Sequence, residues 1–124
     1  LVAVTVLTSM GQEDLVELGC HDEPIDRVCQ LASLAQDAGL DGVVCSAAEA
    51  TVLSARQRNG FLLVTPGIRR AGDAAGGQRR IVTPEGAVAA GATHLVVGRS
   101  ITASRDPAAT AAQIRSALDA QASS

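Results

Sequence analysis

Gly98, Arg99 and Ser100 follow directly after an apolar run that ends at Val97, and their types suit the binding of an anion. A glycine allows the backbone to approach a ligand closely, and the backbone N–H groups that follow it can point at an anion. An arginine adds a planar set of donors that can bind two oxygens at once. Gly98 and Arg99 therefore predict a phosphate site. The alternative interpretation is a tight turn followed by a solvated surface charge.

A second group of charged residues lies in a long segment that follows Pro66 and Gly67 and extends to about Val82. It contains four arginines, one glutamine and three glycines, namely Arg69, Arg70, Arg79, Arg80, Gln78, Gly72, Gly76 and Gly77. A loop between a strand and a helix usually has about 2 to 6 residues, so this one is long. Its glycines and arginines favour a lid that closes over an anionic ligand, with a mobile solvated loop as the alternative.

Other residue types limit the chemistry that this chain can perform. All 10 basic residues are arginine, so the chain itself supplies no Schiff-base lysine, no P-loop lysine and no lysine proton donor. Cys20, Cys29 and Cys45 match neither a zinc-binding nor a disulfide pattern, and we interpret them as small buried residues of a reducing compartment.

The two histidines indicate no catalytic or metal site. His21 lies beside Asp22 and Glu23, but further ligands at suitable spacing are missing, so we expect no metal there. His94 begins an apolar run, which favours a structural role. The residue types also show no serine, histidine and aspartate in an arrangement typical of a hydrolase.

The elements that must position these residues alternate regularly along the chain. Apolar runs predict strands over 2–7, 42–45, 61–65 and 94–97. Capping residues and prolines at the first helical position predict helices over 12–18, 24–38, 46–58, 83–91 and 106–120. Four strand–helix units imply parallel strands joined by right-handed crossovers. In such a sheet the carboxyl ends of the strands carry the function, and the residues above lie at those ends.

Length and composition bound the fold class. Four strand–helix units are half of a TIM (β/α)8 barrel, which needs about 250 residues when complete. A flavodoxin-like open sheet is the competing arrangement. With 124 residues and 47% hydrophobic residues, the chain can form one packed domain over 1–124 without an internal boundary. The sequence starts at Leu1 and not at Met, as expected of a fragment or a processed product.

The charge and the aromatic content exclude further classes. A net charge of -3 and a single aromatic residue, Phe61, argue against a nucleic-acid-binding protein. No apolar run approaches the roughly 18 residues that a membrane span needs, and no signal peptide is recognisable. We therefore expect a cytoplasmic protein that contacts neither nucleic acid nor membrane.

Five segments in order resemble the orotidine 5′-phosphate decarboxylase family, and together they cover the chain from Leu1 to about Ala120. They are residues 4–10, 41–47, 63–69, 78–84 and 97–102. The resemblance implies the C-terminal half, units five to eight, of a barrel of the ribulose-phosphate-binding type. The family converts orotidine monophosphate to uridine monophosphate without a cofactor, in the last step of pyrimidine synthesis.

The resemblance also implies roles for five substrate-binding residues. Thr8 would lie near the pyrimidine ring and its carboxylate, and Pro66 would flank the base. Gln78 would reach from the 66–82 loop to the base and the phosphate. Gly98 and Arg99 would hold the phosphate, in agreement with the prediction from residue types alone.

Two departures from the family pattern are visible. The family usually has an aspartate before the loop glutamine, where this chain has Gly77. The family's catalytic Asp-x-Lys-x-x-Asp array lies in the first half of the barrel, so the resemblance implies that no catalytic residue is in this chain.

Three functions therefore remain open. The first is the phosphate- and base-binding half of the decarboxylase, completed by a lysine-bearing N-terminal half. The second is a non-catalytic half-barrel that associates with a second copy of itself, as a dimer, and binds a phosphorylated ligand. The third is a related phosphosugar barrel enzyme, which the motif from Pro66 to Arg69 makes less favourable.

Overall fold

The computed structural model of the chain describes residues 1–73 and 81–123. Within them, four strands form one sheet: β1 (Val2–Val4), β2 (Gly42–Val44), β3 (Leu62–Thr65) and β4 (His94–Leu95). The strands lie in the order β1-β2-β3-β4 and every neighbouring pair is parallel. The prediction of strand–helix units with parallel strands is thus confirmed, and all four strands present their carboxyl ends on the same edge of the sheet.

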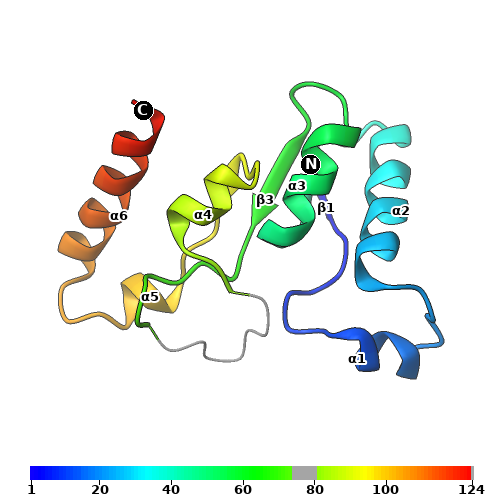
Figure 1. Ribbon diagram of the computed structural model, residues 1–124, viewed down its shortest axis with the longest axis horizontal. Helices are drawn as coiled ribbons and strands as arrows, with labels where there is room; N and C mark the ends of the chain where they lie inside the picture. The colour runs from blue at the N-terminus through cyan, green and yellow to red at the C-terminus, as the bar shows by residue number, and fades with distance from the viewer. Residues whose placement is uncertain (74–80, 124) are drawn as a thin grey trace.

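Helices connect the strands and cover one face of the sheet. They are α1 (Gln12–Glu17), α2 (Pro24–Asp37), α3 (Ala47–Arg56), α4 (Pro84–Ala89), α5 (Arg99–Thr102) and α6 (Pro107–Ala122). Figure 1 shows α2, α3, α4 and α6 side by side in chain order across the molecule. Among the described residues, no helix has the length and apolar character that crossing a membrane requires.

All four strands are shorter than the sequence predicts, β2 and β3 by one residue and the two outer strands by more. The strand predicted over 2–7 ends at Val4, and the strand predicted over 94–97 ends at Leu95. Both are edge strands with one neighbour each, so the chain can leave the sheet without breaking a second ladder. The backbone N–H of Val96 still donates to the Thr65 carbonyl at 2.9 Å.

The two faces of the sheet differ in burial. Val43 and Leu63, which point toward the helices, are 0% and 3% exposed and belong to the main hydrophobic core. Residues that alternate with them, Val44 and Val64, are only half-buried. Val4 is 57% exposed, so the residues that the structure describes leave the inner face of the sheet uncovered.

The predicted capping box at the start of α3 is present. Glu49 Oε2 accepts from the Ser46 backbone N–H at 2.7 Å, and Ser46 Oγ accepts from the Glu49 backbone N–H at 3.4 Å. Both residues are buried, so the paired donors have little access to water. The box fixes the start of α3 directly after β2.

Ser46→Ala is expected to lower the free energy of unfolding by about 0.5 to 1.5 kcal/mol, because the Glu49 N–H loses its partner inside the protein. Urea unfolding followed by far-UV circular dichroism measures the change. Ser33→Ala, at an exposed position of α2, is the matched control and should leave the midpoint almost unchanged. Equal midpoints for the two variants would contradict a stabilising role of the cap.

Candidate functional site

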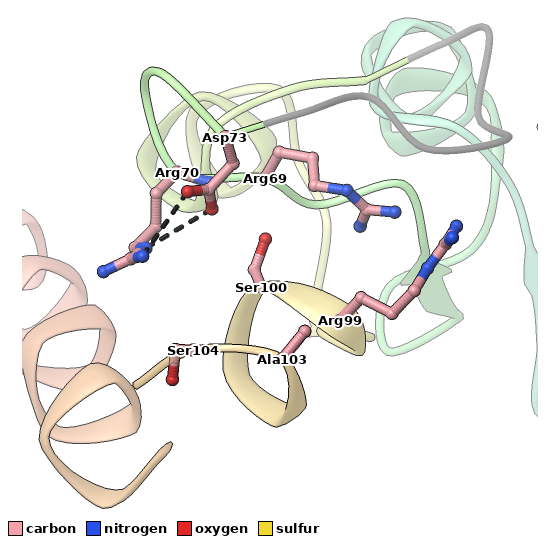
Figure 2. Close-up of a pocket in the computed structure, with 7 residues that line it drawn as sticks. All are labelled: Arg69, Arg70, Asp73, Arg99, Ser100, Ala103 and Ser104. Carbon is pink, nitrogen blue, oxygen red and sulfur yellow. Dashed lines mark hydrogen bonds and ion pairs between the residues drawn. The ribbon is translucent and has the colours of Figure 1, made fainter. Parts of the chain in front are cut away.

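An open pocket of about 250 Å³ lies beyond the carboxyl ends of β3 and β4 (Figure 2). Its lining comes from the segment after β3 and from α5 with the residues that follow it: Arg69, Arg70, Asp73, Arg99, Ser100, Ala103 and Ser104. Three guanidinium groups and one carboxylate leave the lining with a positive charge. Such a pocket attracts an anion of small size.

Backbone pairing holds Arg69 at the pocket. Ile68 forms a parallel bridge with Val82, through which the Arg69 N–H donates to the Val82 carbonyl at 3.0 Å. The Val82 N–H donates in turn to the Gly67 carbonyl at 3.2 Å. Arg69 is only 8% exposed, and its Nη1 donates to the Ile68 carbonyl at 2.8 Å. Both flanks of the 66–82 loop are therefore fixed to each other beside β3.

A tight turn over residues 70–73 follows Arg69. The Asp73 N–H donates to the Arg70 carbonyl at 3.0 Å, and Gly72 has a φ of +88°, a conformation that glycine adopts without strain. Asp73 Oδ2 accepts from the Arg70 backbone N–H at 3.0 Å and from Arg70 Nε at 3.3 Å, and Oδ1 accepts from Nη2 at 3.4 Å. The charge of Arg70 is thereby paired within the turn.

The Asp73 carboxylate also faces α5. The hydroxyl of Ser100 and then the guanidinium of Arg70 lower the pKa of Asp73 below its ordinary value. Because the folded pKa is lowered, the stabilisation is complete above the ordinary aspartate pKa and is lost as the pH falls through the folded value. Ser100 is 7% exposed, and its Oγ makes no hydrogen bond of standard distance and angle with any residue the structure describes.

Arg99 is the first residue of α5, and Gly98 is its N-cap. The Gly98 carbonyl accepts from the N–H groups of Ile101 and Thr102 at 2.9 and 3.1 Å, which closes the short helix. Arg99 is exposed, and within residues 1–73 and 81–123 its guanidinium has no ion pair. Figure 2 shows Arg69 and Arg99 extending to the same side of the pocket, while Arg70 extends to the opposite side. A single anion in the pocket can therefore contact both Arg69 and Arg99.

The structure brings only part of the predicted binding set together. Arg99 lines the pocket and Gly98 adjoins it. Thr8 is buried beyond β1 and Pro66 is half-buried beyond β3, but neither lines this pocket. Gln78, with Gly77, lies outside the described residues.

The sequence pattern assigns Arg69 only to a lid, whereas the structure places it in the lining of the pocket. Its position in the sequence could have indicated a binding role, because Arg69 follows the end of β3 closely, as Arg99 follows the end of β4. Parallel neighbouring strands bring two such positions to one edge of the sheet. The loop arginines Arg79 and Arg80 lie outside the described residues.

Neither histidine is among the residues that line this pocket. His94 begins β4 at the opposite, amino-terminal edge, and its Nδ1 is 3.0 Å from Thr93 Oγ1. In the part of the chain that the structure describes, no three His, Cys, Asp or Glu side chains gather closely enough to hold a metal ion.

Solved structures resemble this fold. The crystal structure of orotidine 5′-phosphate decarboxylase from Lactobacillus acidophilus superimposes with a TM-score of 0.77 at 38% identity, over 93% of this chain and 47% of that one. The enzyme from Sulfolobus solfataricus, at 20% identity and a TM-score of 0.58, supports the fold alone. The architecture is therefore half of a TIM (β/α)8 barrel, as predicted, and not the flavodoxin-like sheet.

Sequence comparison gives the family. A family model described as "Orotidine 5'-phosphate decarboxylase / HUMPS family" matches residues 1–114. The orotidine 5′-phosphate decarboxylase of Teredinibacter turnerae is 56% identical over 92% of this chain and 49% of its own length. That of Klebsiella pneumoniae is 53% identical over 98% of this chain and 50% of its own length. The chain spans about half the length of these curated relatives, and it belongs to the orotidine 5′-phosphate decarboxylase family as the C-terminal half of the barrel.

Proposed function

We propose that this chain is the phosphate- and base-binding half of an orotidine 5′-phosphate decarboxylase, which converts orotidine monophosphate to uridine monophosphate and carbon dioxide. The observation that carries the proposal is the pocket in which Arg69 and Arg99, from the ends of two neighbouring strands, extend to the same side. A phosphate group offers several oxygens to two guanidinium groups at once. Because the chain belongs to the decarboxylase family, we propose a nucleotide as the ligand of this pocket.

The proposed site divides between the phosphate and the base. Gly98, Arg99 and Arg69 hold the phosphate, whereas Thr8, Pro66 and Gln78 contact the pyrimidine. The phosphate is remote from the bond that breaks, so its binding energy acts by orienting the substrate and lowering the barrier at a distant carbon. The proposal includes no cofactor, as the resemblance to the decarboxylase family implies.

The catalytic proton donor has to come from another polypeptide segment, because this sequence contains no lysine. In the proposal an N-terminal half-barrel carries the family's Asp-x-Lys-x-x-Asp array and packs against the uncovered inner face of the sheet. The open edges of β1 and β4 offer unpaired backbone groups to its strands. The completed enzyme belongs to pyrimidine biosynthesis in the cytoplasm, where the three cysteines stay reduced.

A second candidate function is supported by the same open edges. Val4 on β1 is 57% exposed and Val96, just beyond β4, is 49% exposed, and two copies of this chain can cover each other's apolar edges. The resulting dimer binds a phosphorylated ligand at two copies of the pocket and has no lysine. Sedimentation, nucleotide titration and a decarboxylation assay together distinguish the two functions. A stable dimer that binds uridine monophosphate, yet gains no activity when an N-terminal half is added, favours this second function.

Arg99→Ala is expected to weaken binding of uridine monophosphate to the full chain by about 1.5 to 3 kcal/mol, the contribution of a hydrogen bond to a charged group. Titration calorimetry with uridine monophosphate measures the loss. Arg115→Ala is the matched control, because Arg115 pairs with Asp119 on the exposed side of α6 and lies outside the pocket. Unchanged affinity of the Arg99 variant would remove Arg99 from the phosphate site.

A further inference from the structure

The 70–73 turn, formed by Arg70, Ala71, Gly72 and Asp73, follows Arg69 directly and lines the anion pocket together with α5. We infer that Asp73 is a positioning residue of the anion pocket: it keeps this turn closed, so that Arg69 faces the ligand beside Arg99. The inference rests on the proposed phosphate site and says which residue keeps Arg69 in place. Asp73 touches no substrate in this assignment and acts through Arg69.

On the side of the turn, the contacts of Asp73 are extensive. Its carboxylate accepts from the backbone N–H, Nε and Nη2 of Arg70 at 3.0, 3.3 and 3.4 Å. Its own N–H closes the turn on the Arg70 carbonyl at 3.0 Å. Arg69 directly precedes this turn, so the path of its backbone depends on the turn staying closed. The side chain of Asp73 is 23% exposed, which reduces screening of these contacts by water.

On the side of α5, the hydroxyl of Ser100 is the group that acts on Asp73, because it lowers the pKa of that carboxyl below its ordinary value. Ser100 is 93% buried and lines the pocket, and Figure 2 shows its Oγ directed to the side on which Asp73 and Arg69 lie. Within the described residues its Oγ makes no hydrogen bond of standard geometry, either to Asp73 or to another group. Closure of the turn therefore rests on the contacts between Asp73 and Arg70.

A competing role for Asp73 predicts the opposite result. As a fourth charge in the pocket, its carboxylate could repel a phosphate and weaken binding. The pairing with Arg70 argues against this role, because the carboxylate and the guanidinium largely cancel at the distance of a bound anion. A positioning role leaves Arg69 and Arg99 as the two cations that meet the ligand.

Asp73→Asn removes the charge at nearly constant volume and is expected to weaken binding of uridine monophosphate by the full chain about fivefold to twentyfold, within the range of couplings between contacting residues. Asp119→Asn is the matched control, because Asp119 accepts from Arg115 Nε at 2.9 Å on exposed α6. That variant breaks the same kind of pair outside the pocket and should bind like the wild type. Gly72→Ala strains the same turn, because Gly72 has a φ of +88°, and it should weaken binding likewise; it serves as the second variant where Asp73→Asn does not fold.

Combining Asp73→Asn with Arg69→Ala separates positioning from a general loss of structure. When Arg69 is already absent, Asp73→Asn should weaken binding less than twofold further, because the residue it positions is gone. Additive losses would overturn the inference, and so would equal or tighter binding by the Asp73 variant. A wild-type chain that binds no uridine monophosphate would overturn the phosphate site and this inference together, whereas equal binding by Asp73→Asn overturns the inference alone.

Discussion

Addition of a lysine-bearing N-terminal half-barrel to this chain is expected to raise decarboxylation of orotidine monophosphate from background by at least about a hundredfold to ten-thousandfold. That range is what a positioned general acid contributes to a proton transfer, and this sequence has no lysine to serve as one. Binding and orientation of the phosphate add to the rate only after the proton donor is present, because both act on the same transition state.

The assay compares three preparations: the chain alone, the N-terminal half alone, and their mixture. Release of carbon dioxide from orotidine monophosphate reports the activity of each. An N-terminal half whose catalytic lysine is replaced by alanine is the control, and its mixture with this chain should stay at background. Arg99→Ala in the active mixture should reduce kcat/KM in proportion to the weaker phosphate contact. Robust turnover by the chain alone would contradict the proposal that the N-terminal half supplies the catalytic proton donor.

Gly42→Ala is expected to lower the free energy of unfolding by more than about 3 kcal/mol, at the upper end of the cost of overpacking. A Cβ added at Gly42 would overlap the Leu62 carbonyl oxygen and lie 2.5 Å from Leu62 Cβ. Gly42 and Leu62 are opposite each other in the β2–β3 ladder, where the Leu62 N–H donates to the Asp41 carbonyl at 2.9 Å. A backbone oxygen in a ladder cannot rotate away, so β2 and β3 would have to separate.

Far-UV circular dichroism in urea measures this loss, since the chain has neither tryptophan nor tyrosine for fluorescence. Ser33→Ala is the control for stability, because Ser33 is exposed on α2 and lies outside the sheet. That variant should unfold within about 0.5 kcal/mol of the wild type. A Gly42 variant as stable as the Ser33 variant would show that the β2–β3 spacing adapts to a methyl group.

Most of the elements were predictable from local chemistry. The Ser46–Glu49 box, Thr83 before Pro84 and Asp106 before Pro107 mark the starts of α3, α4 and α6, and all three side chains accept from the first turn as predicted. Apolar runs located the four strands. Their ends were less predictable, because β1 and β4 are edge strands whose length depends on one neighbour and not on their own residues.

Only one of the two arginines of the anion site was predictable as a binding residue from the sequence. Gly98 and Arg99 stand together in the sequence, so their chemistry is visible without a fold. Arg69 lies 30 positions earlier and has the appearance of a loop charge until β3 and β4 are paired. The presence of Asp73 and Ser100 in one pocket has no local signal at all, because the turn after β3 and α5 come together only in the folded chain.

By itself the sequence determined the alternation of strands and helices, the absence of a lysine proton donor and the resemblance to a decarboxylase half-barrel. These features follow from residue types and from spacings within one helix or strand. The tertiary structure alone decided which arginines share a pocket, which one is paired with a carboxylate, and which face of the sheet stays uncovered. Such choices depend on contacts between segments far apart in the chain, and those contacts form only when parallel strands align their carboxyl ends on one edge.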